Sequence, residues 1–224
     1  MKKEKLHVYF VPGLAASIAI FEYIRLPEDR FEIHLLPWLV PLTKDENLGN
    51  YAQRMCESIT EKNHVLIGVS FGGIMVQEMR KISKPLQTII ISSVKHSNEF
   101  PLRLKIVKNT RAYKLTPIKA ITNIEKFAEY LYGDAIKKRA ELYKKYLSMR
   151  DEKYLPWSIK NVLHWTQNTN TDQIIHIHGN KDGIFPIKNI KNCIIVDGGT
   201  HIMILNKAKK ISKIIAEKLE YLTK

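Results

Sequence analysis

The sequence predicts an α/β fold, with a mostly parallel central sheet, helices on both of its faces and a long helical insertion. Short apolar runs of strand length alternate with segments in which apolar residues recur three and four positions apart. This alternation is typical of parallel strands joined by crossover helices. The chain has 224 residues, enough for a substantial core, so we expect a single domain over 1–224.

The predicted elements follow one another along the chain. Apolar runs predict strands at 6–11, 64–67, 86–92, 173–178 and 193–196. Helical patterns occupy 51–59, the segment directly after residue 72, and the C-terminal 207–224. About eighty residues separate the third and fourth of these strands, far more than a crossover needs. Because they contain helical patterns at about 124–132, 135–149 and 154–165, we expect a helical insertion at about 98–168.

Gly68-Val69-Ser70-Phe71-Gly72 is the most informative motif of the chain. It has the pattern G-x-S-x-G and lies between a buried-strand pattern and a helical pattern. In this context the motif indicates a nucleophile elbow, a sharp turn that exposes a serine oxygen above the sheet. The glycines leave room for neighbouring backbone that a side chain would block. Ser70 is therefore the candidate nucleophile.

A serine nucleophile needs a base, and the base needs a carboxylate that orients it. Asp182 and His201 each follow a predicted strand, in the chain order Ser, Asp, His that is typical of this kind of sheet. Both side chains are therefore expected at the carboxyl edge of the sheet, where open α/β sheets build their sites.

Other residues compete for these two roles. Asp197 and Glu99 are the rival acids, although the first is better placed to cap a turn. The second follows the strand after the elbow, a less usual place for the acid. His176 and His178 lie inside a strand and are expected to be ordinary core or edge histidines. The other histidines in or beside strands, for which we expect the same, are His7, His34 and His64.

The first predicted strand ends in a turn, Pro12-Gly13, that is followed by a helical pattern. This turn would aim the backbone N–H of Leu14 at the space above Ser70. The N–H of Phe71, at the start of the next helix, supplies a second donor. These two N–H groups form the predicted oxyanion hole.

The order of Pro12-Gly13, the serine motif, Asp182 and His201 resembles the α/β-hydrolase superfamily, and within it small bacterial esterase-like serine hydrolases. The resemblance covers nearly the whole chain. It implies the α/β-hydrolase fold, with Ser70 as nucleophile, Asp182 as orienting acid and His201 as general base and acid. One difference is visible at the first turn, where the superfamily commonly has His-Gly. The resemblance does not specify a substrate.

In the superfamily that this chain resembles, an insertion at 98–168 is a cap that excludes water and shapes the pocket. The insertion is rich in aromatic residues, most of which we expect to pack the cap onto the body. Its candidate substrate-binding residues are Trp157, Leu163, His164 and Trp165. A largely apolar pocket would suit an acyl or aromatic ester group.

The net charge of +14 would suit a nucleic-acid or acidic-lipid partner, but the basic residues are mostly dispersed lysines. No motif of a nucleic-acid-binding protein accompanies them, so we expect a solvated basic surface and no nucleic-acid partner. The two cysteines, Cys56 and Cys193, are far apart and lack metal-ligand spacing. We therefore expect no metal site or disulfide framework from them.

The N-terminus superficially resembles a secretory signal, because lysines precede an apolar run that continues to Phe21. Cleavage there would remove the first strand and the Leu14 donor, which argues against this interpretation. No apolar stretch is long enough to span a bilayer, so we expect a cytoplasmic protein.

These features predict a serine hydrolase that cleaves a carboxylic ester of a small or medium apolar substrate through an acyl-enzyme, without a cofactor. Two alternatives stay open. One is an enzyme of the same fold that acts on a thioester, an amide or a carbon–carbon bond. The other is a non-catalytic member of the fold that binds a ligand. The sequence makes no prediction of the oligomeric state.

Overall fold

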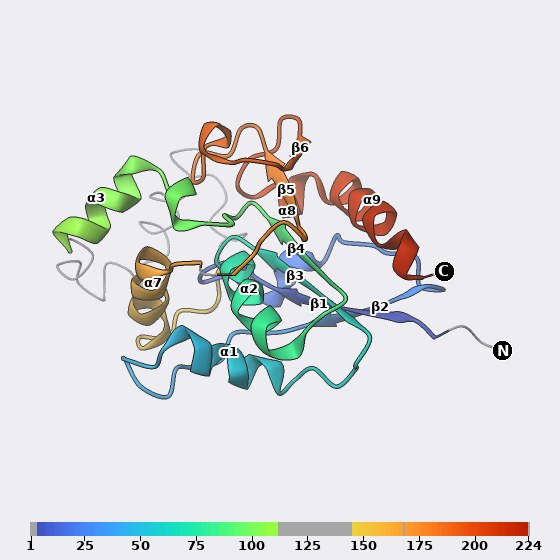
Figure 1. Ribbon diagram of the computed structural model, residues 1–224, viewed down its shortest axis with the longest axis horizontal. Coiled ribbons are helices and arrows are strands. Elements are labelled where there is room, and N and C mark those ends of the chain that lie inside the picture. Colours follow the sequence, from blue (N-terminus) through green and yellow to red (C-terminus); the bar gives the residue numbers. More distant parts are fainter. Residues whose placement is uncertain (1–3, 112–144, 168, 224) are drawn as a thin grey trace.

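Six parallel strands form the centre of the computed structural model, which describes residues 4–111, 145–167 and 169–223 (Figure 1). The order of the strands in the sheet is β2-β1-β3-β4-β5-β6. The predicted α/β fold with a parallel central sheet is therefore confirmed. The strands are β1 (Leu6–Val11), β2 (Phe31–Leu35), β3 (His64–Val69), β4 (Gln87–Ile91), β5 (Ile174–Gly179) and β6 (Ile194–Val196).

The five strands expected from apolar runs all form, each within two residues of its expected bounds. The sixth, β2, has no such run because it lies at the edge of the sheet. Only Phe31 of this strand is buried, and Ile33 and Leu35 are both exposed. An edge strand with one exposed face does not need the continuous apolar sequence of a central strand.

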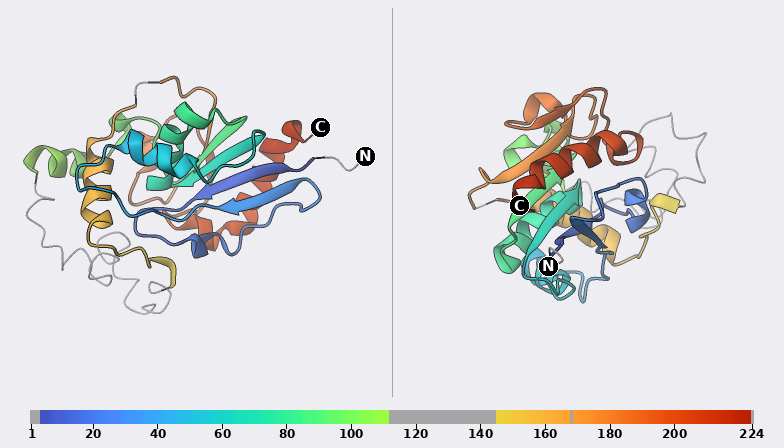
Figure 2. Two further views of the ribbon diagram at one scale, coloured as in Figure 1. Left: turned by 90° about the horizontal axis from the view of Figure 1, so that it is seen from below. Right: turned by 90° about the vertical axis from the view of Figure 1, so that its right-hand side faces the viewer.

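Helices cover both faces of the sheet (Figures 1 and 2). On one face, α1 (Leu48–Cys56) and α2 (Phe71–Ser83) pack against strand residues such as Tyr9 and Leu66. On the other face, η1 (Ile18–Phe21), α8 (Met203–Asn206) and α9 (Ala208–Leu219) pack against Val8 and Ile67. Successive residues of a strand thus contribute to the two cores on opposite faces of the sheet, because side chains alternate in direction along a strand.

Two further helices, α3 (Leu102–Thr110) and α7 (Tyr154–His164), lie beyond the carboxyl ends of the strands (Figure 1). The second forms where a helix was expected at 154–165. The expected helix at 124–132 and most of that at 135–149 lie outside the described residues, as does the middle of the proposed insertion. None of the described helices is long and apolar enough to cross a bilayer. The remaining short helices are η2 (Ser97–Glu99), η5 (Ile187–Asn189) and η6 (Glu220–Leu222).

The turn between β3 and α2 packs directly against the end of β1. A Cβ atom added to Gly72 would lie 2.3 Å from the carbonyl oxygens of both Val11 and Pro12. A Cβ atom added to Gly68 would lie 2.1 Å from the carbonyl oxygen of Gly72. Both distances are far below van der Waals contact, so these backbone segments can approach only because glycine has no side chain.

We expect Gly72→Ala to lower the free energy of unfolding by about 3 kcal/mol, because the methyl group would force the turn away from β1. The midpoint of urea unfolding measures this loss. Gly183→Ala is the matched control, since a Cβ atom there meets nothing within 4 Å, and its midpoint should stay at the parent value. A Gly72→Ala midpoint equal to that of the parent would contradict the close packing.

Candidate active site

Ser70 lies at the apex of the turn between β3 and α2, in a backbone conformation that only glycine adopts easily. Its φ is 54° and its ψ is −117°, and such strain costs of order 1–3 kcal/mol. Three hydrogen bonds hold the residue there: its N–H donates to Ile91 O at 2.9 Å, and its carbonyl accepts from Gly73 N–H at 2.9 Å and Ser93 Oγ–H at 2.7 Å. The Ser70 side chain consequently projects beyond the carboxyl end of the sheet.

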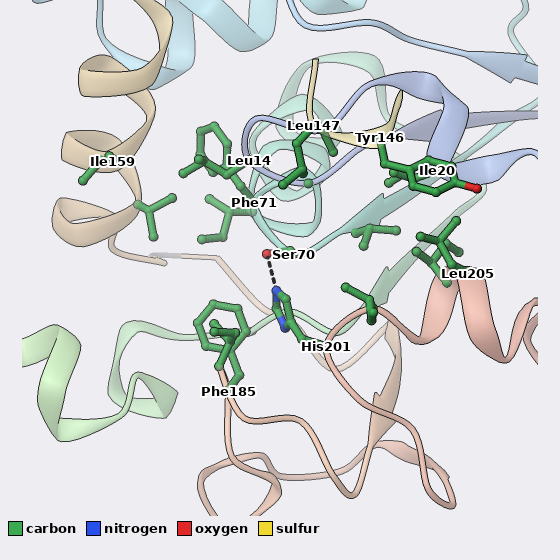
Figure 3. Close-up of a pocket in the computed structure, with 18 of the residues that line it drawn as sticks. Leu14, Ile20, Ser70, Phe71, Tyr146, Leu147, Ile159, Phe185, His201 and Leu205 are labelled. Carbon is green, nitrogen blue, oxygen red and sulfur yellow. Dashed lines mark hydrogen bonds between the residues drawn. The ribbon is translucent and has the colours of Figure 1, made fainter. Parts of the chain in front are cut away.

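A hydrogen-bonded chain joins the three residues singled out by motif and chain order. Ser70 Oγ lies 2.9 Å from His201 Nε2, as the dashed line in Figure 3 marks. On its other side, His201 Nδ1 lies 2.9 Å from Asp182 Oδ2 and 3.1 Å from Oδ1. An ionised carboxylate only accepts hydrogen bonds, so Nδ1 carries the proton and Nε2 can accept the hydrogen of the serine hydroxyl.

Asp182 is a buried carboxylate whose charge is stabilised by its neighbours. Its Oδ1 accepts hydrogen bonds from the N–H groups of Ile184 at 2.8 Å and Phe185 at 2.9 Å. Burial acts to raise the pKa of Asp182, but the electrostatic interaction and hydrogen bond with His201 and the hydrogen bond from the Phe185 N–H outweigh it. The pKa therefore lies below its ordinary value, and the carboxylate is ionised at neutral pH.

The two rival acids have other partners in this structure. Asp197 is exposed, and its Oδ1 accepts a hydrogen bond from the Asn180 side chain at 2.7 Å. Glu99 is buried and accepts hydrogen bonds from the backbone N–H of Lys95 at 2.6 Å and of Lys191 at 3.5 Å. The geometry therefore favours Asp182 as the partner of the histidine.

Behind Asp182 lie two buried histidines that the sequence indicated only as strand residues. His178 Nε2 donates to Phe185 O at 2.8 Å and lies 3.6 Å from Asp182 Oδ2. A carbonyl cannot donate, so His178 Nδ1 is the acceptor, and His176 Nε2 donates to it at 3.1 Å. Burial lowers the pKa of both imidazoles, which keeps them neutral. They anchor the loop that carries the carboxylate, and their i, i+2 spacing was the only sequence signal that they share a face.

The turn after β1 lies against the serine. A Cβ atom on Gly13 would be 3.5 Å from the Cβ of Ser70, and Trp38 Nε1 donates to Gly13 O at 2.8 Å. Phe71 is the first residue of α2, where an N–H has no partner within the helix. Leu14 and Phe71 both line the cavity that contains Ser70 (Figure 3). The supporting contact of Trp38 was not foreseen, because nothing in the sequence connects it to this turn.

A cavity of about 410 Å³ opens above Ser70 and His201, and most of its lining is apolar (Figure 3). The lining side chains come from segments that are far apart in the sequence. They include Ile20, Leu104, Val107, Tyr146, Leu147, Ile159, Val162, Leu163, Ile184, Phe185, Ile204 and Leu205. The site therefore places the Ser70–His201 pair at the wall of a largely apolar cavity.

Of the four candidate substrate-binding residues, the structure places only Leu163 in the lining of this cavity. Trp157 is fully buried and its Nε1 donates to Glu46 O at 2.7 Å. Trp165 is also buried, and its Nε1 donates to a carboxylate oxygen of Glu78 at 2.8 Å. His164 is exposed. These three are corrected to positions outside the cavity lining.

The reason for this correction is the periodicity of α7. Residues advance by about 100° each in an α-helix, so Ile159, Val162 and Leu163 share one face, which lines the cavity. Trp157 and His164 are seven positions apart and lie on the opposite face. The large aromatic residues Trp157 and Trp165 therefore lie outside the lining, whereas smaller aliphatic side chains of α7 form part of the cavity wall.

Comparison with known proteins identifies the fold from structure, but it finds no family by sequence. No protein-family model and no curated protein matches the sequence. A thermophilic esterase from Thermogutta terrifontis superposes with a TM-score of 0.71 at 13% identity, over 100% of this chain and 92% of that chain. A structure from a study of Nitrososphaera gargenis carboxylesterases gives a TM-score of 0.70 at 17% identity, over 98% and 92%.

MenH from S. aureus is also similar, with a TM-score of 0.64 at 15% identity, over 97% of this chain and 95% of that chain. These similarities extend over nearly the full length of both partners in each comparison. The chain therefore has the α/β-hydrolase fold, which confirms the fold that the resemblance implied.

Proposed function

We propose that this protein is a serine hydrolase that cleaves a carboxylic ester of a small or medium apolar substrate. The observation that carries the proposal is the chain Ser70–His201–Asp182, with separations of 2.9 Å at both links, at the wall of an apolar cavity. A serine in hydrogen-bond contact with a histidine, which a carboxylate orients in turn, is the arrangement that activates a serine hydroxyl. The esterases among the proteins of similar fold support the same reaction class.

In the proposed first half-reaction, Ser70 Oγ attacks the carbonyl carbon of the ester while its proton moves to His201 Nε2. Asp182 stabilises the imidazolium that forms, because its carboxylate faces Nδ1. The N–H groups of Leu14 and Phe71 stabilise the tetrahedral oxyanion, a contribution of about 2.7–4 kcal/mol for one such donor. The imidazolium then protonates the leaving alcohol, and an acyl-enzyme remains.

In the second half-reaction, His201 takes a proton from a water molecule, which attacks the acyl carbon. The tetrahedral intermediate collapses, Ser70 Oγ regains its proton from His201, and the acid leaves. The proposed steps use only protein groups and water. The neutral histidines behind Asp182 have no part in proton transfer in this scheme; they hold the carboxylate loop in position.

The cavity supports an apolar acyl or alkyl group as the substrate class. A volume of about 410 Å³ falls within the range of roughly 300–1,000 Å³ that is typical of small-molecule sites. The described lining contains aliphatic side chains from α3 and α7 and few charged groups. An acyl chain would therefore gain by leaving water, whereas a charged substituent would lose hydration there.

We expect Ser70→Ala to reduce the turnover of p-nitrophenyl butyrate by at least about 1,000-fold, because the attacking oxygen is removed. Steady-state kinetics with equal concentrations of folded protein measure the loss. Ser58→Ala, at an exposed serine after α1, is the matched control and should keep the parent rate. Turnover by Ser70→Ala close to that of the parent would remove Ser70 from the nucleophile role.

We expect Leu104→Trp to shift selectivity toward short acyl chains, because the indole would occupy space in the cavity. The ratio of kcat/KM for p-nitrophenyl octanoate over acetate should fall about tenfold or more, given the value of each methylene in an apolar pocket. Leu102→Trp, on the same helix but 72% exposed, is the matched control and should keep the parent ratio. An unchanged ratio in Leu104→Trp would place the acyl chain elsewhere.

A further inference from the structure

Two histidines and a glutamate meet on one face of β1 and the neighbouring edge strand β2, away from the candidate active site. His7 Nδ1 lies 2.9 Å from His34 Nε2, and His34 Nε2 lies 3.8 Å from Glu32 Oε1. One ligand atom from each residue lies within 4.8 Å of the other two. The three groups thus converge on one point, and the proposed reaction uses none of them.

The strand register explains this convergence. In the parallel pairing of β1 and β2, His7 is opposite Glu32 and Tyr9 is opposite His34. Side chains of alternate residues point to the same face, so all these residues share one face of the two strands. His7 is six residues upstream of the position next to Ser70 in the sheet, roughly 20 Å away at about 3.3 Å per residue.

The neighbours of the cluster restrict how its imidazoles can turn. The ring of His34 stacks on Tyr9 with centroids 4.4 Å apart and planes 14° from parallel. Glu61 Oε2 lies 4.0 Å from His7 Nε2, the ring nitrogen that faces away from His34. A carboxylate on the outer nitrogen of a histidine is the arrangement that orients metal-ligating imidazoles and makes them more basic. Both imidazoles therefore have a neighbour outside the cluster that restricts their orientation: Tyr9 for His34 and Glu61 for His7.

We propose that His7 Nδ1, His34 Nε2 and a Glu32 carboxylate oxygen bind a divalent transition-metal ion of the zinc type. Ligand atoms around tetrahedral zinc are roughly 3.3 Å apart, because each bond is about 2.0 Å long. The separations of 2.9 and 3.8 Å bracket this value, and His7 and Glu32 offer ligand atoms within 4.8 Å of each other. Side-chain shifts of up to about 1.5 Å would therefore complete the site. Water supplies the fourth ligand.

The donor set selects the class of metal. Two imidazole nitrogens and one carboxylate oxygen suit zinc, nickel or copper(II), whereas calcium and magnesium prefer oxygen ligands. The side chains are partly exposed, with 14% of His7, 28% of His34 and 51% of Glu32 accessible, so an ion can enter without opening the core.

The proposed ion would fasten β2, the edge strand, to β1. Two of its ligands come from β2 and the third from β1. Only Phe31 of β2 is fully buried, so this strand has little apolar packing of its own to hold it. Metal binding to the folded state alone would stabilise the protein by mass action and raise its melting temperature.

Isothermal titration calorimetry of the tag-free, chelator-treated protein with Zn²⁺ tests the proposal. We expect one equivalent to bind with a Kd of about 10 µM or tighter, and the melting temperature to rise with added Zn²⁺. His34→Gln and Glu32→Gln should each weaken binding by at least about tenfold, as expected for removal of a ligand. Because Glu32 is half exposed, its replacement leaves the fold intact even if the His34 variant is unstable.

His96→Gln is the matched control. His96 follows β4, forms a hydrogen bond with the Thr171 side chain and does not belong to the cluster. Its affinity for Zn²⁺ should equal that of the parent. Absence of saturable binding at 100 µM Zn²⁺ would overturn the site and reduce the cluster to a histidine–histidine hydrogen bond. Binding of parent strength in Glu32→Gln and His34→Gln would also overturn it, since the ion would then lie elsewhere.

Discussion

The close packing of Gly72 against the end of β1 is the constraint on which the rest of the site depends. It brings the Gly13 turn to the serine and leaves Ser70 in a strained conformation, with φ of 54°. That strain persists because hydrogen bonds hold the residue in place: the Ser70 N–H donates to Ile91 O, and the Ser70 carbonyl accepts from the Ser93 hydroxyl. One backbone contact therefore sets both the exposure of the candidate nucleophile and the position of the predicted oxyanion donors.

The second requirement of the site is a negative charge next to His201, and the buried carboxylate of Asp182 supplies it. An isolated ion at the position of Asp182 would be strongly destabilised by loss of hydration. Backbone N–H groups at 184 and 185 and the imidazole of His201 compensate for that loss. His178 in turn holds the carboxylate loop through its hydrogen bond to Phe185 O. The geometry at Ser70 therefore also depends on a hydrogen bond that involves none of the three site residues.

The sequence predicts the sheet and the order of the three site residues, because apolar runs and the elbow motif are local signals. It does not predict β2, Trp38 or the role of His178. Edge strands have weak patterns, and contacts such as that of Trp38 with Gly13 join residues that no local pattern relates. Trp157 lies outside the cavity for a different reason, because the size of a side chain does not show which face of the helix carries it. Its neighbours Ile159 and Val162 line the cavity instead.

Labelling with a fluorophosphonate, followed by mass spectrometry of the modified peptide, tests most directly whether His201 activates Ser70. We expect a single adduct on Ser70 of the parent, formed at least about 100 times faster than in His201→Ala, which keeps the serine but lacks the base. A folded parent that forms no adduct at Ser70 would contradict the account. An equal labelling rate in His201→Ala would contradict it too, because the hydrogen bond between the two side chains would then have no chemical consequence.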